Sequence, residues 1–287
     1  MALYRLDQTA ASELIAPSLV AALDGWVDAG SAATAAVAQL AQGGRVVATF
    51  DNDQLYDYRS RRPTLQIVDG RLAELTWPEL LLRATVVEGR DVLVLSGAEP
   101  DDRWRTLAAD LVELSERLGV AEWISVGAIP AAVPHTRPVP ILGTASQPDL
   151  LRGDVRAGPT GLLRVPGAAI SVLEMAIAAA GLPAVGYFAQ VPHYVNGPYP
   201  AAALELVQAV ARHLDVAAPL SALAEEARQI RARLDTATAV DEAARTYVER
   251  LEAMADEERL PSGDDLIADI EKFLRERGEE GTPRSQA

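Results

Sequence analysis

Two glycines five residues apart mark the first stretch of the sequence whose residue types could do chemistry. Gly25 and Gly30 follow an apolar run and precede an alanine-rich segment, as the glycines of a phosphate-binding loop do. Such a loop needs a lysine for the β and γ phosphates and a hydroxyl for magnesium, but Ser31 and Ala32 occupy those positions. Asp28 would add a carboxylate that repels phosphate. The stretch therefore does not predict a nucleotide loop, and it lacks the third glycine of a dinucleotide site.

The same stretch predicts a turn from a strand into a helix. Ligands of open α/β sheets bind beyond the carboxyl ends of the strands, which is where this turn would lie. Two interpretations of Asp28 stay open: its carboxylate caps the following helix, or it faces a ligand or a neighbouring subunit with Asp24 and Trp26. An indole flanked by small residues is typical of an interface or a pocket wall.

Two of the three histidines lie in rigid loops that follow predicted strands. His135 stands in Pro-His-Thr-Arg-Pro beside Arg137, and His193 stands in Pro-His-Tyr beside Tyr194, with Asn196 close behind. A histidine next to an arginine and an aromatic ring could hold an anion, and both loops could share a sheet edge with the glycine loop. The alternative is that the two histidines brace loops or subunit contacts through hydrogen bonds.

Several classes of chemistry are not supported by the sequence. The chain has no cysteine, which excludes thiolate nucleophiles and thiolate metal ligands. No HxH or HExxH spacing predicts a metal site, and Ser96 lies in no GxSxG turn. The only lysine is Lys272, so the region before it has no lysine for catalysis. We expect no cofactor and no metal.

Composition bounds the cellular setting of the 287-residue chain. Its net charge of −15, without a segregated basic patch, argues against nucleic-acid binding. No stretch approaches the ~20 apolar residues of a membrane span, and the N-terminus shows no signal peptide. We expect a cytoplasmic protein that contacts neither nucleic acid nor membrane.

Apolar runs and helical periodicity alternate along the first 215 residues. The alternation predicts a mostly parallel sheet with helices on both faces. An Asp-Gly pair at 69–70 between two strand-like runs predicts a hairpin. The predicted strands are 19–23, 46–50, 64–68, 72–75, 91–95, 122–126, 139–144 and 184–190, and the predicted helices are 31–42, 101–118, 167–180 and 199–214.

The pattern changes after residue 215 to amphipathic helices with an acidic excess. Apolar residues at three- and four-residue spacing predict one helix up to Leu234, a break at 235–238, a second helix through Met254 and a third from residue 261. We therefore expect an α/β domain at 1–215, a helical extension at 216–277 and a disordered tail at 278–287. The acidic faces are interpreted as solvated surface, or alternatively as a partner-binding surface.

Four short motifs resemble those of bacterial members of the PAC2 family, which is named for a proteasome assembly chaperone. They are Asp-Gly-Trp-Val-Asp-Ala-Gly at 24–30, Gly-Ala-Ile-Pro at 127–130, Pro-His-Thr-Arg-Pro at 134–138 and Pro-His-Tyr at 192–194. The resemblance implies a three-layer αβα sandwich, similar to nucleoside phosphorylases and related hydrolases, with a helical C-terminal extension. It also implies homo-oligomers, trimers among them.

What the resemblance implies about function is a choice between two classes. Eukaryotic and archaeal members of the family bind immature proteasome α-rings and dock a C-terminal hydrophobic-Tyr-X motif, whereas this chain ends Ser285-Gln286-Ala287 without a tyrosine. We expect a non-catalytic, homo-oligomeric, protein-binding protein related to assembly chaperones. The alternative is a small-molecule binder or an enzyme, similar to a phosphorylase, a hydrolase or a carboxylate–amine ligase, with its pocket at the carboxyl edge of the sheet.

Overall fold

A computed structural model describes residues 2–153, 155–159, 161–218 and 220–259 of the chain. Two compact units can be distinguished, residues 1–235 and the part that begins at Thr236. The helix expected from residue 261 and the tail expected at 278–287 lie outside the described residues. The boundary between the α/β domain and the helical extension, expected between residues 215 and 216, stays a prediction.

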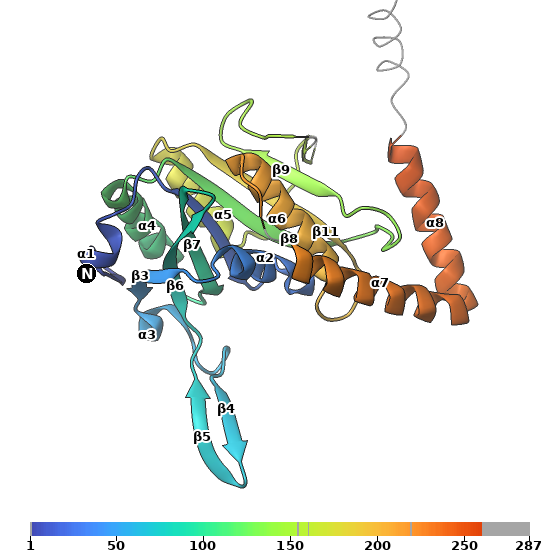
Figure 1. The fold of residues 1–287 in the computed structure, drawn as a ribbon, viewed down its shortest axis with the longest axis horizontal. Helices are drawn as coiled ribbons and strands as arrows, with labels where there is room; N and C mark the ends of the chain where they lie inside the picture. Colours follow the sequence, from blue (N-terminus) through green and yellow to red (C-terminus); the bar gives the residue numbers. More distant parts are fainter. Residues whose placement is uncertain (1, 154, 160, 219, 260–287) are drawn as a thin grey trace, which may run out of the picture. The chain divides into compact units, whose positions relative to one another are not determined.

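Nine strands form the main sheet of the described chain, in the order β1-β3-β6-β7-β2-β8-β11-β9-β10 (Figure 1). The strands of this sheet are β1 (Tyr4–Leu6), β2 (Ser18–Asp24), β3 (Arg45–Phe50), β6 (Leu80–Val87), β7 (Arg90–Ala98), β8 (Glu122–Ala131), β9 (Ile141–Ala145), β10 (Arg156–Ala157) and β11 (Ala184–Pro192). The helices are α1 (Gln8–Ala11), α2 (Ala32–Leu40), α3 (Asn52–Leu55), α4 (Trp104–Leu118), α5 (Ala169–Ala179), α6 (Pro200–Leu214), α7 (Ser221–Val240) and α8 (Glu242–Arg259), with a 3₁₀ turn at Ala29–Ser31.

The main sheet is mixed, so the expectation of a mostly parallel sheet was wrong. Strands β7, β2, β8 and β11 run parallel in its centre. Strands β1, β3 and β6 continue from β7 by antiparallel pairs, and β9 pairs antiparallel with β11. Glu88 and Gly89, both with positive φ, reverse the chain in two residues and join β6 to β7 as a hairpin. This turn signal and its first strand, Leu80–Val87, escaped the prediction.

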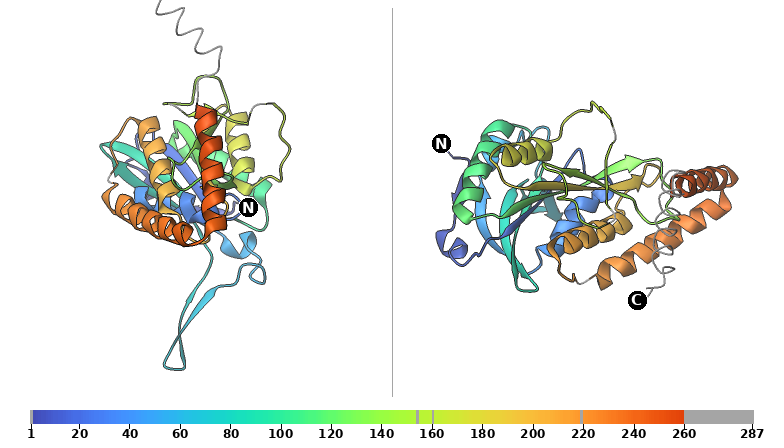
Figure 2. Two further views of the ribbon diagram at one scale, coloured as in Figure 1. Left: turned by 90° about the vertical axis from the view of Figure 1, so that its right-hand side faces the viewer. Right: turned by 90° about the horizontal axis from the view of Figure 1, so that it is seen from above.

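The central strands are buried on both faces, which gives the predicted three-layer αβα fold. Along β2, alternate side chains point to opposite faces. Leu19, Ala21 and Leu23 pack in the cluster that α4 and α5 cover, whereas Val20 and Ala22 pack in the cluster of α2 and α6. The right-hand view of Figure 2 shows the two helix pairs on opposite sides of the sheet. This continuous burial explains why these strands read as unbroken apolar runs.

Two predicted helix limits were wrong, each because of a local hydrogen bond or backbone angle. Helix α4 begins at Trp104 rather than at residue 101, because the N–H groups of Asp101 and Asp102 both donate to the carbonyl of Leu55 and Arg103 is left-handed. Helix α7 continues through 235–238, where a break was expected. The break falls instead at Asp241, whose carboxylate accepts N–H groups at the start of α8.

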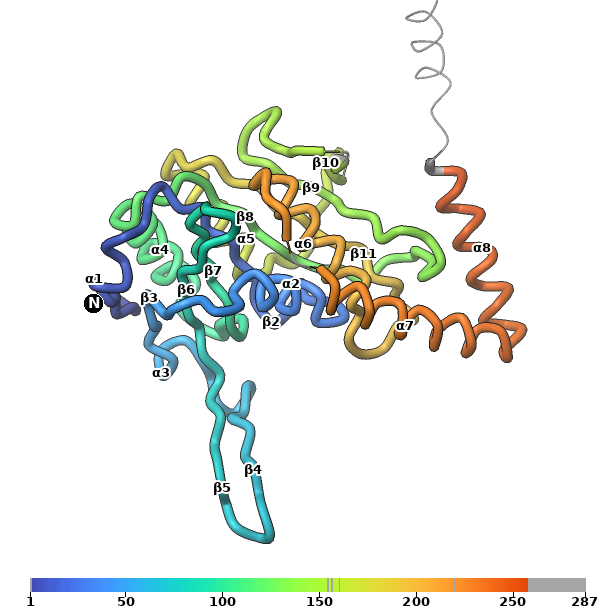
Figure 3. The backbone as a smooth tube through the Cα atoms, in the orientation of Figure 1, coloured from blue at the N-terminus to red at the C-terminus, as the bar shows by residue number. Residues whose placement is uncertain are grey.

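The predicted hairpin is confirmed as β4 (Thr64–Val68) and β5 (Arg71–Thr76), joined by Asp69 and Gly70 with positive φ. The two strands form a separate two-stranded sheet. Figures 1 and 3 show it extending away from the main sheet, between α3 and β6. Every residue of both strands is exposed.

A buried chain of hydrogen bonds ties α6 to the central strands. His213 lies between the hydroxyl of Tyr187, at 2.7 Å from Nδ1, and the carboxylate of Glu122, at 3.0 Å from Nε2. Glu122 also accepts from the Ser18 hydroxyl at 2.7 Å. The hydrogen bond with His213 lowers the pKa of the Glu122 carboxyl. His213 is thus a buried link between α6, β8 and β11.

We predict that Glu122→Gln lowers the free energy of unfolding at pH 7 by about 1–3 kcal/mol, because a charged acceptor is lost from a buried network. A carboxyl group whose pKa is lowered by folding stabilises the protein above its unfolded pKa, and this stabilisation is lost as the pH falls through the folded pKa. The difference between variant and wild type should therefore shrink below about pH 4. Urea unfolding across pH measures it, with the exposed Glu116→Gln as control. A pH-independent difference would contradict this account.

Candidate functional site

The predicted turn after β2 is held by the carboxylate of Glu99. Its two oxygens accept the N–H of Trp26 at 2.9 Å and the N–H of Ala169, the first residue of α5, at 2.7 Å. A Cβ at Gly25 would collide with the Glu99 side chain, which is why glycine is needed there. These contacts therefore fix the backbone of the loop where it leaves β2.

The other end of the loop is fixed by Gly30 and Asp28. Gly30 has a φ of +62°, and its carbonyl accepts the N–H of Tyr199. Asp28 is buried, and its carboxylate accepts the Ala33 N–H at 2.7 Å and the Thr34 hydroxyl at 2.5 Å. Burial raises the pKa of the Asp28 carboxyl. Asp28 thus caps the start of α2, one of the two interpretations that the sequence left open.

The middle of the loop faces outward. Trp26 is 67% exposed although its own N–H is held by Glu99. Asp24 is exposed at the end of β2, and its carbonyl accepts the N–H of Glu99 and a guanidinium N–H of Arg61. The Trp26 side chain therefore takes little part in packing, although its backbone is fixed.

The hydroxyl of Tyr194 connects the two histidine loops. Tyr194 Oη accepts the His135 N–H at 2.8 Å and lies 2.7 Å from His135 Nδ1. The other ring nitrogen of His135 lies 3.2 Å from a carboxylate oxygen of Asp235 on α7. His135 is buried between these partners. His193 is exposed, with Nδ1 at 3.0 Å from the carbonyl of Ala131, and Asn196 is exposed two residues after Tyr194.

A cavity of about 680 Å³ lies beside His135 and Arg137. Neither the other six predicted site residues nor Glu99 line it. Its walls come from the 135–139 loop, α6 and α7, and its lining residues are His135, Arg137, Pro138, Val139, Tyr199, Ala201, Leu204, Glu205, Ala224, Ala227, Arg228, Arg231, Ala232 and Asp235. Within the described ranges, no group of three or more acidic or histidine side chains could hold a metal ion.

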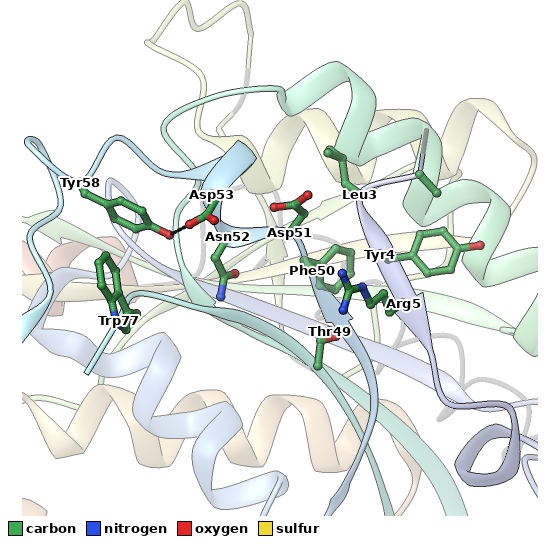
Figure 4. Close-up of a pocket in the computed structure, with 11 residues that line it drawn as sticks. Leu3, Tyr4, Arg5, Thr49, Phe50, Asp51, Asn52, Asp53, Tyr58 and Trp77 are labelled. Carbon is green, nitrogen blue, oxygen red and sulfur yellow. Dashed lines mark hydrogen bonds between the residues drawn. The ribbon is translucent and has the colours of Figure 1, made fainter. Parts of the chain in front are cut away.

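A second cavity, of about 670 Å³, lies at the base of the β4–β5 hairpin (Figure 4). Tyr58 and Trp77 form an edge-to-face pair there, with ring centroids 4.6 Å apart. The Tyr58 hydroxyl donates to Asp53 at 2.7 Å, and burial with this bond raises the pKa of Tyr58 to about 12. The lining residues are Ala2, Leu3, Tyr4, Arg5, Thr49, Phe50, Asp51, Asn52, Asp53, Tyr58 and Trp77.

Sequence reasoning overlooked Glu99 and Asp235. Glu99 carried a weak signal, because it lies four residues after the predicted strand 91–95, much as Asp24 follows the predicted strand 19–23, and β7 pairs with β2. Asp235 carried none, because its contact with His135 spans 100 residues and lies on a helix whose path the sequence does not fix. Sequence reasoning also missed the second cavity, because it did not predict the edge strand β1, whose residues Tyr4 and Arg5 line that cavity.

Comparison with known proteins places these features in a family. The PAC2 family model matches residues 22–238, a range that includes Glu99, Asp235 and all eight predicted site residues. The chain belongs to the PAC2 family. The resemblance drawn from the four motifs is thereby confirmed, and the PAC2 match ends inside α7.

Three crystal structures resemble this PAC2 chain along most of its length. A Corynebacterium glutamicum protein of unknown function is 34% identical, with a TM-score of 0.83 over 89% of this chain and 97% of that one. A Mycobacterium tuberculosis protein of unknown function is 36% identical, with a TM-score of 0.81 over 88% and 91%. A proteasome-assembly chaperone homologue of the same species is 36% identical, with a TM-score of 0.74 over 80% and 99%. No curated protein matches the chain.

Hydropathy adds one finding about the helices. Of those in the described ranges, none combines the length and the apolar character that crossing a bilayer requires.

We predict that Asp28→Ala lowers the free energy of unfolding by about 1–2 kcal/mol, because α2 loses its cap. Asp28→Asn should cost less than half as much, since its amide oxygen still accepts the Ala33 N–H. Chemical unfolding of the three proteins at neutral pH gives the comparison. Equal stability of Asp28→Ala and wild type would show that the carboxylate does not hold the helix.

Proposed function

We propose that this protein is a homo-oligomeric, cytoplasmic, non-catalytic assembly factor that binds proteasome subunits before they assemble. The observation that carries the proposal is the contrast within the predicted site. The side chains suited to catalysis, those of Asp28 and His135, are buried in hydrogen bonds, whereas Trp26 projects from a fixed loop. Exposed indoles of this kind are typical anchors of protein interfaces.

Family membership supports the choice of partner. The similar Mycobacterium tuberculosis structure is described as a proteasome-assembly chaperone homologue, and it is matched over 99% of its length. Trp26 and the surrounding loop would supply the binding surface.

We predict that Trp26→Ala weakens binding to unassembled proteasome subunits of the same organism about 30-fold, as expected when an interface anchor worth about 2 kcal/mol is removed. Surface plasmon resonance with the purified subunits measures the change. Ile15→Ala is the matched control, because Ile15 is 81% exposed and precedes β2, at the opposite edge of the sheet from Trp26. Absence of binding by the wild type, or equal binding by Trp26→Ala, would contradict the proposal.

A second candidate function rests on the cavity beside His135. Arg137, Arg228 and Arg231 line a space whose volume is typical of small-molecule sites. An anionic ligand, such as a phosphate ester or an acyl compound, would match these cations. A thermal-shift screen with phosphate, nucleosides and carboxylates tests it, and a shift that Arg137→Ala abolishes would support a ligand site over a purely structural cavity.

A further inference from the structure

The cavity beside His135 contains a buried hydroxyl group that the described chain leaves without a partner. Tyr199 lines this cavity and is 3% exposed, and its hydroxyl makes no hydrogen bond with any residue that the structure describes. Within the described chain, the side-chain atoms that are both sealed from solvent and unbonded are Arg61 Nε and Ser115 Oγ. The Tyr199 hydroxyl is not among them, so it keeps an opening, which the cavity provides. A buried polar group of this kind requires a partner from outside the chain, either solvent or a ligand.

A carboxyl group in the same cavity also lacks a partner. Glu205 on α6 is partly buried and makes no hydrogen bond or ion pair with the described residues. Burial raises the pKa of this carboxyl, and the charge of Arg212 opposes the rise only in part. Arg228 also lines the cavity, but it is paired with Glu225 on its own helix. The charged form of Glu205 is therefore stabilised when a cation or a hydrogen-bond donor enters the cavity.

The two groups lie toward different ends of the cavity. Tyr199 stands at the start of α6, where burial raises its pKa to about 12 and the charge of Arg231 on α7 opposes that rise. Arg231 also donates to the carbonyl of Thr136, next to Arg137. Tyr199, Arg231 and Arg137 therefore belong to one end. Glu205 lies six residues further along α6, a rise of about 9 Å.

The end at Tyr199 suits an anion. Arg137 and Arg231 both line it, and Asp235 offsets the charge of Arg231 from a distance of 3.7 Å. The Tyr199 hydroxyl stays protonated at neutral pH, so it can donate a hydrogen bond. A guanidinium group beside a hydroxyl group offers a carboxylate two kinds of donor.

Most of the remaining lining is apolar and built of small residues. Leu204 of α6 and Val139 of the preceding loop contribute to it, together with Ala201, Ala224 and Ala227. Alanines on both helices leave open the space that larger side chains would fill. The ligand that fits best thus has an apolar body, an anionic group at one end and a cationic group at the other.

We propose that this cavity binds a short apolar peptide in extended form, with its C-terminal carboxylate at Tyr199 and Arg137 and its N-terminal ammonium group at Glu205. Three extended residues span about 10 Å, which matches the rise between Tyr199 and Glu205. A single amino acid carries both charged groups on one carbon atom and cannot reach both ends. The proposal rests on the second candidate function, a ligand site in this cavity, and names the class of ligand.

Isothermal titration calorimetry of the full chain with the tripeptide Ala-Leu-Ala tests the two ends. Acetylation of the peptide removes its ammonium group, and amidation removes its carboxylate. Each modification should raise the dissociation constant at least 10-fold, because a hydrogen bond to a charged group is lost. Absence of binding by the unmodified tripeptide, or equal binding of all three peptides, would overturn the proposal.

Two conservative variants assign each end to its residue. Glu205→Gln should weaken binding of the unmodified peptide at least 10-fold and that of the acetylated peptide less than 3-fold. Tyr199→Phe should weaken binding of the unmodified peptide at least 5-fold and affect the amidated peptide less. Both should unfold at the wild-type temperature, since neither group has a partner in the described chain, and the exposed Glu226→Gln on α7 is the control for binding. A variant that weakens all three peptides equally would contradict the end assigned to it.

Failure of this proposal differs from failure of the functions proposed above. If phosphate or a simple carboxylate binds, Arg137→Ala abolishes that binding and no peptide binds, the ligand site stands and only the peptide is wrong. Binding of proteasome subunits through Trp26 is a separate measurement, because Trp26 does not line the cavity. A chain that binds the tripeptide but no subunit would contradict the assembly function and leave the peptide site in place.

Discussion

The carboxylate of Glu99 is the contact on which the carboxyl edge of the central sheet depends. Where the parallel strands end, the backbone N–H groups of the following loops lose their partners and must find acceptors. Glu99 accepts two of them, one from the loop after β2 and one from the first turn of α5. Because one side chain serves elements more than 140 residues apart, their positions are coupled. Glu99 fixes the backbone of Trp26, while the side chain of Trp26 stays exposed.

The residues that looked most suited to catalysis likewise use one side chain to satisfy several neighbouring groups. Asp28 and His135 are both buried, and each makes hydrogen bonds to two or more groups around it. An unpaired polar group in these positions would cost about 1–3 kcal/mol, so the fold itself requires such partners. Residue types that could act on a substrate thus serve to hold loops at the edge of the sheet. The outward surface of the edge is left to exposed side chains such as that of Trp26.

The parts of the fold that local sequence determines were predictable. The Asp69–Gly70 turn, the apolar runs of β2 and β8 and the glycine after α4 each reflect a constraint within a few residues. The mixed sheet was not predicted, because strand direction depends on pairings between distant segments. The site shows the same limit: the loops could be located from the strands that they follow, but the contact of His135 with Asp235 depends on where a distant helix lies.

The residues of the β4–β5 hairpin are separate from those that build the α/β core. It is inserted between β3 with its short α3 turn and β6, which are antiparallel neighbours in the main sheet and could be joined by a much shorter connection. None of its strand residues belongs to either buried cluster of the α/β core. Its length, turn and face chemistry can therefore vary among relatives without redesign of the core. In this chain the hairpin is a module whose sequence can diverge while the scaffold beneath it stays the same.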